Sequence, residues 1–420
     1  MEQKSDSRTP WIWVPTLYFA EGLPYFIVTT IALVLFKDLV MDNGTLALVT
    51  SLISLPWTLK PLWSPFVDIF KSKRWWILGM QAIMAVAVAV IALMLPRMST
   101  FTPVLLLFVV VAFASATHDI SADGYYMIAL DQRRQSAFVG IRNTFYRIAM
   151  VFGQGVLVVI AGLLEKRSGD TPKAWSLTLI ITAAILAAIS LYHSFLLPKP
   201  DDDKVAEKKR AGEVFREFGN AFATFFTKKG VWLAVAFMLL FRLPEAFSVK
   251  MLYPFFSDSL SAGGLGLDKA AYGIVYGTAG VIALLAGGIL GGLHISRSGL
   301  KKCIFPMALS LALPCVVYLI MAIFQPSSLL TIGALVVLDQ FGYGYGFTAY
   351  TVYMMRFSEG PLKTSHYALC TGFMALSMLI PGAVAGYLQQ WLGYVGFFIL
   401  VMLCCLATIT VSLLARRRLS

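Results

Sequence analysis

The sequence predicts an all-α membrane protein with twelve transmembrane helices, arranged as two pseudo-symmetric six-helix bundles. Three observations support this class. Of the 420 residues, 58% are hydrophobic and 13% are charged, whereas a soluble domain is nearer half apolar and a quarter charged. Apolar stretches of roughly 20 residues recur along the chain, and the second half repeats features of the first. A chain with so little polar surface must face lipid.

Twelve apolar stretches give the expected helices. Because no water solvates the backbone in the lipid core, each amide must be satisfied within its own segment, which favours helices. The stretches at 45–69 and 101–130 are the least uniformly apolar of the twelve. The expected spans are 11–36, 45–69, 74–96, 101–130, 137–164, 174–197, 230–257, 269–293, 301–324, 328–356, 365–388 and 393–415.

Lysine and arginine predict the orientation, because they are enriched in the cytoplasmic loops of membrane proteins. With a cytoplasmic N-terminus, 23 of the 34 Lys and Arg residues fall on inner segments, 6 on outer segments and 5 within spans. An odd number of helices would place the two basic termini on opposite sides. We therefore expect both termini in the cytoplasm. The net charge of +12 is then a topology signal and does not indicate binding to nucleic acid.

One long polar stretch, residues 198–229, divides the chain. It begins with Pro-Lys-Pro-Asp-Asp-Asp and then becomes basic. Phenylalanines recur in it at helical spacing, at Phe215, Phe218, Phe222 and Phe225. This pattern favours an amphipathic helix on the inner membrane face, and a plain linker is the alternative. We expect an N-terminal bundle over 1–197, a cytoplasmic linker with this helix over 198–229, and a C-terminal bundle over 230–420.

The two halves resemble each other at a shift of 220 residues. The aligned features fall on the first and fourth helices of each half, as duplicated six-helix halves require. The aligned pairs are Leu23-Pro24 with Leu243-Pro244, Asp38 with Asp258, Asp119 with Asp339, and Gly124 with Gly344.

Four ionisable residues fall near the middle of expected spans: Glu21, Arg242, Glu245 and Asp339. A charge there costs roughly 2.5–3.5 kcal/mol on insertion scales, so it needs a partner or a water-filled cavity. Arginine recognises carboxylate or phosphate through its planar donors, and a buried carboxylate can take up a proton. We expect substrate binding or proton coupling from these four. Ion pairs that only hold helices together are the alternative.

A second charged group lies nearer the cytoplasm. Asp119 and Asp123 are four residues apart, hence on one face of a helix, and His118 is next to them. The next helix runs antiparallel and brings Arg142 to the depth of Asp123 and Arg147 to that of Asp119. The two arginines are about 140° apart, so only one faces the acids. We expect Asp119, Asp123, Arg142 and His118 to form a charge network or gate, with anion binding as the alternative, and Arg147 to reach the cavity.

Aromatic and small residues add further candidates. Tyr25 and Tyr343 are expected to touch substrate, because sugar rings and peptide groups pack on aromatic faces, although most membrane aromatics face lipid or the interface. Gly342, Gly344 and Gly346 lie inside a span. They predict close helix contact or local unwinding.

The sequence contains none of the usual signatures of an enzyme or a metalloprotein. It has no CxxC, Cys/His cluster, P-loop or nucleophile elbow, and its five cysteines lie in or beside apolar stretches of the second half. We therefore expect neither an enzyme nor a metal site, and no cofactor other than a proton as the coupling ion.

Two loops resemble the major-facilitator signature G-x-x-x-D-R-x-G-R-R. The loop after the second helix keeps an acid, Asp68, followed by basic residues. The loop after the eighth helix carries Arg297, Gly299 and two lysines, with Ser296 in place of the acid. The resemblance implies the major-facilitator fold, in which this loop latches helices on the cytoplasmic side. Asp68, Arg297 and Gly299 are expected to do so here.

Three stretches over residues 18–123 are similar to the AmpG-type muropeptide permeases, a branch of that superfamily related to the acetyl-CoA transporters. They are Tyr-Phe-Ala-Glu-Gly-Leu-Pro-Tyr at 18–25, Leu-Trp-Ser-Pro-Phe-Val-Asp at 62–68 and Ser-Ala-Thr-His-Asp-Ile-Ser-Ala-Asp at 115–123. His118 stands where the family usually has Gln.

This resemblance implies a monomeric secondary active transporter of the bacterial inner membrane. It would import N-acetylglucosaminyl-anhydromuramyl peptides, which are small anionic glycopeptides, by proton-driven alternating access. Siderophore importers of similar build share the G-L-P first helix. Import of a siderophore, or of another anionic metabolite such as an acyl-CoA-like compound, is therefore the alternative.

Overall fold

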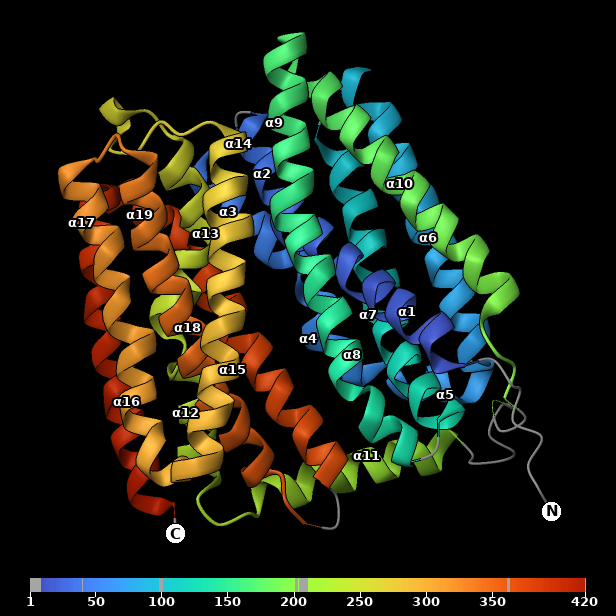
Figure 1. The fold of residues 1–420 in the computed structure, drawn as a ribbon. Helices are drawn as coiled ribbons and strands as arrows, with labels where there is room; N and C mark the ends of the chain where they lie inside the picture. The colour runs from blue at the N-terminus through green and yellow to red at the C-terminus, as the bar shows by residue number, and fades with distance from the viewer. Residues whose placement is uncertain are drawn as a thin grey trace. The chain divides into compact units, whose positions relative to one another are not determined.

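The computed structural model describes residues 9–39, 41–97, 101–130, 132–200, 203, 211–360 and 363–419. Within these residues all regular structure is helical, which confirms the predicted all-α class (Figure 1). The chain divides into two compact units. Unit 1 consists of Met1–Ala32 and Leu59–Arg216, and unit 2 of Leu33–Thr58 and Glu217–Ser420. These units are defined by contacts, whereas the bundles expected over 1–197 and 230–420 follow chain order and stay a prediction.

Unit 1 contains the first helix and the third to sixth long helices. Its elements are α1 (Pro10–Phe26), the π-helix η1 (Ile27–Ile31), η2 (Lys60–Leu62), α5 (Ser64–Phe70), α6 (Lys73–Met94), η3 (Leu95–Arg97), α7 (Thr102–Ala129), α8 (Gln132–Val151), the π-helix η4 (Phe152–Val156), α9 (Leu157–Ser168) and α10 (Thr171–Leu196).

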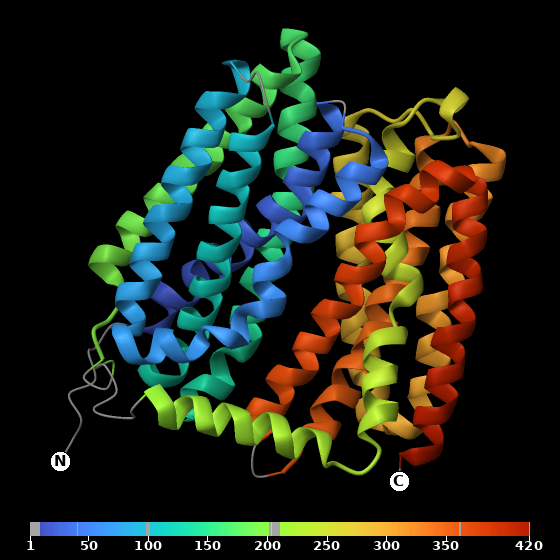
Figure 2. The same ribbon diagram turned by 180° about the vertical axis from the view of Figure 1, so that it is seen from behind.

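Unit 2 contains the remaining elements. They are α2 (Ala32–Asp38), α3 (Asn43–Ile53), α4 (Leu55–Leu59), α12 (Val231–Leu240), α13 (Leu243–Ser257), η5 (Leu260–Ala262), α14 (Lys269–Tyr272), the π-helix η6 (Gly273–Gly280), α15 (Val281–Ser298), α16 (Leu300–Ala312), η7 (Leu313–Cys315), α17 (Val316–Phe324), α18 (Leu329–Phe357) and α19 (Lys363–Arg418). Helix α11 (Ala211–Phe226) joins the units, and its second half runs crosswise to α12 (Figure 2).

The expected spans agree with these helices to within a few residues. Nine described helices are long and apolar enough to cross a membrane. One of them, α19, is two helices that meet at Gly393, where φ is 68°. With α19 counted as two, these helices make ten spans, and helix α18 and the broken stretch 43–70 bring the described spans to the predicted twelve. Exposed apolar side chains such as Trp391 (81% exposed) and Leu330 (84%) fit a surface that faces lipid.

The breaks in these helices have local causes. The stretch 43–70 contains three prolines and forms α3, α4, η2 and α5 in place of one helix, because proline removes a helical hydrogen bond and clashes with the preceding turn. Pro244 follows the break between α12 and α13. Pro24 leaves α1 unbroken, but a π-helix begins three residues later at Ile27.

The glycines of α18 bring three helices into close contact. A Cβ at Gly344 would lie 2.0 Å from the carbonyl oxygen of Leu284 on α15, and one at Gly342 would lie 2.2 Å from that of Ser310 on α16. Gly346 similarly meets the carbonyl of Met307. Helix α18 is continuous through all three glycines. Of the two expectations for these glycines, close helix contact is therefore confirmed and local unwinding is wrong.

We expect Gly344→Ala to lower the thermal unfolding temperature of the purified protein in detergent. The added methyl group forces α15 and α18 apart, and such overpacking costs about 1–3 kcal/mol. Gly292→Ala on α15 is the matched control, because a Cβ there meets nothing within 4 Å. Equal unfolding temperatures for the two variants would contradict the close packing.

Candidate functional site

Unit 2 contains a charged cluster at the break between α12 and α13. Arg242 lies just before α13 and is 7% exposed. Its Nε and Nη2 atoms donate to the two carboxylate oxygens of Glu245 at 2.7 and 2.8 Å, and Nη2 also donates to the Tyr343 hydroxyl at 2.8 Å. The guanidinium packs over Phe347, 4.8 Å from the ring centroid. The sequence-predicted residues Arg242, Glu245 and Tyr343 therefore contact one another directly.

A second polar group of unit 2 surrounds Asp339 on α18, which is 6% exposed. Its Oδ2 accepts from the Tyr318 hydroxyl at 2.6 Å and from the Gln340 amide at 3.0 Å. Among the described residues Asp339 has no cationic partner, unlike Glu245. Its charge is therefore held by hydrogen bonds alone.

A cavity of about 30 Å³ lies between these two groups. This volume has room for a water molecule or two, which need polar partners such as these. The lining residues are Glu245, Ser248, Val249, Leu252, Tyr276, Leu311, Cys315, Tyr318, Asp339, Gln340 and Tyr343.

We expect Arg242→Gln to lower the thermal unfolding temperature more than the double variant Arg242→Gln/Glu245→Gln. Breaking a buried pair leaves a charge without compensation and costs about 3–5 kcal/mol, whereas removing both charges costs less. Arg356→Gln, at the exposed end of α18, serves as the control. Equal destabilisation by the single and double variants would show that the pair is not electrostatically coupled.

Unit 1 holds the buried acid Glu21 in the middle of α1. It is 7% exposed, and its Oε2 atom has no hydrogen-bond partner among the described residues. Leaving a buried polar atom without a partner costs free energy. The next residue, Gly22, packs directly on α8: a Cβ there would lie 3.0 Å from the Tyr146 carbonyl oxygen. Glu21 is thus fixed in a tightly packed part of the helix.

The predicted helix 4 and helix 5 charges form two ion pairs in unit 1. Arg142 on α8 pairs with Asp123 on α7 at 2.8 Å, as the sequence spacing predicts. Its guanidinium lies 4.4 Å from the Tyr18 ring centroid, and the Tyr18 hydroxyl donates to Asp123 at 3.2 Å. Asp119 pairs with Lys60 instead of an arginine. Lys60 was not among the predicted site residues.

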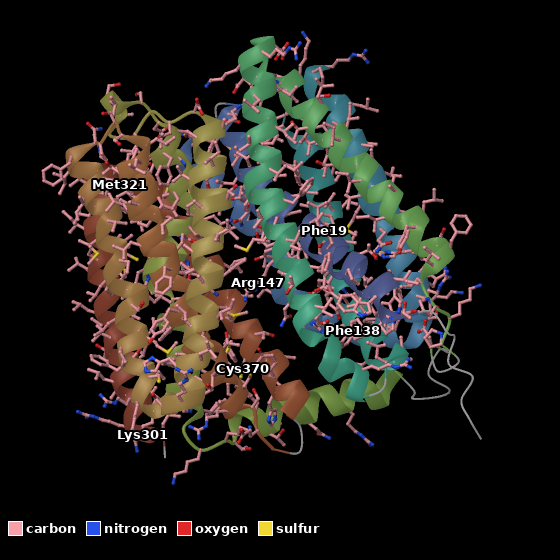
Figure 3. All side chains as sticks on the ribbon, in the orientation of Figure 1. Phe19, Phe138, Arg147, Lys301, Met321 and Cys370 are labelled. Carbon is pink, nitrogen blue, oxygen red and sulfur yellow. The ribbon has the colours of Figure 1, made fainter. Side chains whose placement is uncertain are left out.

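Arg147 and Tyr25 are two further residues that the sequence predicted for the site. Arg147 is exposed and projects from α8, beyond the part of that helix that carries Phe138 (Figure 3). Tyr25 on α1 packs edge-on against Phe26, with ring centroids 5.1 Å apart. Their predicted roles in binding stay predictions.

His118 contacts a different set of residues from the one that we expected. Gln81 lies between it and a second histidine, with its amide nitrogen 3.0 Å from His118 Nε2 and 2.9 Å from His193 Nδ1. His193 Nε2 is 2.9 Å from Thr16 Oγ1. The Gln81 amide oxygen also lies 3.1 Å from His193 Nδ1, so the donor and acceptor roles of the two rings depend on their tautomers. His118 therefore lies in a buried polar chain with Gln81 and His193. Its predicted place in the charge network with Asp119 and Asp123 stays a prediction.

Unit 2 contains reciprocal ion pairs that the sequence did not predict. Asp258, at the end of α13, pairs with Lys37 on α2 at 2.7 Å, and Asp38 pairs with Lys269 on α14 at 2.8 Å. Asn43 donates to Gln389 on α19 at 2.7 Å. Asp38 and Asp258 are the two acids that the internal repeat aligns, so the repeat was the one sequence signal that marked them.

The second of the two predicted signature loops, which follows α15, lies within the described part of the structure. Helix α15 ends at Ser298, and Gly299 has φ of 76°, a left-handed value that favours glycine. Its N–H donates to the Ile295 carbonyl at 2.8 Å, which caps the helix. Arg297 is exposed. The side chain of Asp68 lies outside the described part of the structure.

Near the first copy, a carboxylate of the linker caps a helix of unit 1. The two oxygens of Asp203 accept from the backbone N–H groups of Lys73 and Arg74, at 2.6 and 2.9 Å. These groups begin α6, where helical N–H groups lack internal partners. The start of the linker is thereby tied to this helix.

In the described residues, long apolar helices with breaks beside charged residues and with buried ion pairs indicate a multi-pass membrane protein. Residues 16–361 match the Major Facilitator Superfamily. The match covers most of the chain, so this protein belongs to that superfamily, as the signature loops predict.

Curated relatives support the AmpG-type resemblance. The chain is 24% identical to the anhydromuropeptide permease of Escherichia coli (strain K12) over 374 residues, covering 88% of this chain and 72% of that one. It is 24% identical over 416 residues to a putative transporter named AmpG 4 of Rickettsia felis, covering 96% and 95%. These relatives are named as permeases and transporters rather than enzymes, in agreement with the sequence prediction.

Solved structures share the fold. The nucleoside transporter NupG aligns with a TM-score of 0.70 at 16% identity, covering 97% of this chain and 99% of that one. A bacterial homologue of the human lysosomal transporter Spinster, solved in an inward-facing and unoccupied conformation, gives a TM-score of 0.73 at 15% identity, with coverage of 99% and 98%. At these identities the likeness confirms the predicted major-facilitator fold and nothing finer.

Proposed function

We propose that this chain is a proton-coupled importer of anhydromuropeptides that works by alternating access. The observation that carries the coupling is a pair of acids at membrane depth, Glu21 in unit 1 and Asp339 in unit 2, neither of which has a cationic partner among the described residues. An unpaired carboxylate in a low-dielectric site favours its neutral form. Each acid can therefore bind a proton at one stage of the cycle and release it at another.

The cargo is inferred from the relatives. The permease of Escherichia coli is named for anhydromuropeptides, and residues 18–165 resemble the same family. Such glycopeptides are anionic and carry sugar rings. Arg147, Tyr25 and Tyr343 supply the cationic and aromatic surfaces that such groups prefer. Arg242 is already paired with Glu245, so its role in this proposal is to hold Tyr343 in place rather than to receive the anion.

We also propose a membrane location and an oligomeric state for this protein. We place the protein in the bacterial inner membrane as a monomer with both termini in the cytoplasm. This orientation rests on the surplus of lysine and arginine on the inner segments. We further propose that the cargo moves from periplasm to cytoplasm and that protons moving down their gradient drive this import.

We expect the purified protein in liposomes to accumulate N-acetylglucosaminyl-anhydromuramyl tripeptide when the outside is acidified. Glu21→Gln and Asp339→Asn should each abolish accumulation against a gradient while leaving exchange of labelled for unlabelled cargo, because a side chain that cannot titrate cannot couple to protons. Glu359→Gln, at an exposed loop position, should behave like the wild type.

Two outcomes would contradict the proposal in different ways. Uptake by wild type that ignores the proton gradient would exclude proton coupling. Failure to bind or exchange the tripeptide at all, with binding of a siderophore or an acyl-CoA-like anion instead, would replace the cargo with the alternative.

A further inference from the structure

Within the described part of unit 2, one cation inside an expected span has no carboxylate partner. Lys250 lies on α13, seven residues before its end at Ser257, which is about 10 Å at ~1.5 Å per residue. Lys60, Arg142 and Arg242 each pair with an acid. Among the described residues, Lys250 has only the Thr50 hydroxyl as a polar partner, at 3.3 Å. A lysine at this depth without a counter-charge indicates a function by default.

The contact with Thr50 positions the ammonium group without saturating it. Thr50 is fully buried, and its hydroxyl donates to the Leu46 carbonyl at 2.8 Å. It can therefore only accept from Lys250. An ammonium group has three N–H donors, and a distance of 3.3 Å is at the long end for such a bond. Two donors of Lys250 remain available to a ligand.

A second unpaired donor lies beside this lysine. Ser51 is 1% exposed, and its Oγ atom has no hydrogen-bond partner among the described residues. Gly382 on α19 backs both side chains. The place where its Cβ would lie is 3.0 Å from Ser51 Oγ, 3.3 Å from Lys250 Cγ and 3.6 Å from Lys250 Cε. The Ser51 hydroxyl and the lysine stem therefore both pack against Gly382, where a larger residue would displace them.

We propose that Lys250 and Ser51, with Thr50 as the positioning residue, form a subsite for a carboxylate group of the transported molecule. A point charge with free N–H donors and a free hydroxyl is the donor set that binds such an oxyanion. Three helices build the subsite: α3, α13 and α19. The proposal rests on the proposed import of an anionic glycopeptide and identifies where its peptide carboxylate binds.

The test compares two forms of one cargo by isothermal titration calorimetry on the full-length protein in nanodiscs. One form is N-acetylglucosaminyl-anhydromuramyl tripeptide, and the other is the same compound with the peptide carboxylates amidated. Wild type should bind the acid form roughly 10- to 100-fold more tightly, as expected for hydrogen bonds to a charged group. Lys250→Gln should lose this preference by weakening only the acid form, and Lys250→Arg should keep part of it.

Matched variants separate binding from folding. Ser51→Ala should weaken the acid form by roughly 2- to 10-fold, the range for a neutral donor. Lys301→Gln, exposed at the start of α16 (Figure 3), should change neither form. The unfolding temperature of Lys250→Gln should equal or exceed that of wild type, because the variant buries one unpaired charge fewer.

Three results would overturn the subsite. Lys250→Gln could weaken both forms equally or leave both unchanged, and either result would mean that the lysine does not recognise a carboxylate. It could also unfold at a clearly lower temperature, which would mean that the lysine is not the unpaired charge on which the subsite rests. In these cases wild type still binds the tripeptide, so the proposed function stands. If wild type binds neither form, the proposed function fails and the subsite fails with it.

Discussion

A charge in the lipid core must be paired, bonded or enclosed, and this constraint organises both units. Insertion scales put the cost of an isolated charge at roughly 2.5–3.5 kcal/mol, which exceeds most single packing contributions. Pairs such as Arg242–Glu245 and Arg142–Asp123 meet the constraint within the protein. A few wholly or partly buried ionisable residues do not meet this constraint through an ion pair. Glu21, Asp339 and Lys250 are such residues, and they form no ion pair among the described residues.

The irregular backbone lies where these polar groups lie. Arg242 lies at the break between α12 and α13, and π-helical turns follow Glu21 and precede the body of α15. Backbone irregularity at membrane depth is tolerated where it is buried in protein or faces water. A π-helical turn also adds a residue to the helix without ending it, and such turns are frequent at functional sites. The buried polar residues and the irregular backbone therefore occur together because both need surroundings that satisfy polar groups.

The sequence predicted the helices well and the charge pairs only in part. Hydropathy over about 20 residues is a strong signal, so the spans agree with the structure to within a few residues. The Asp123–Arg142 pair followed from counting depth along two adjacent antiparallel helices. The same counting failed for Lys60 and Asp119, because the stretch around Lys60 is broken and its register cannot be extended from its ends.

Contacts between residues that are far apart in the chain could not be predicted from the sequence. The Lys37–Asp258 pair joins residues that no local period connects, and only the internal repeat marked the acid. The contact of His118 with Gln81 was not predicted, because a helix with polar residues on two faces does not reveal which face meets which helix. Lys250 was counted among the basic residues within spans, but its lack of an acid partner is visible only in three dimensions.

The glycine contacts of α18 have a mechanical consequence. Backbone meets backbone at Gly344 against α15 and at Gly342 against α16, with no side chains between them that could slide or change rotamer. Sliding of these three helices past one another would force backbone atoms into overlap, so the packing favours their moving as one rigid body. Asp339 belongs to α18, and Tyr318 belongs to α17, which continues α16 through a short turn. A rigid body of this kind would keep the hydrogen bond between Tyr318 and Asp339 intact during any movement of the unit.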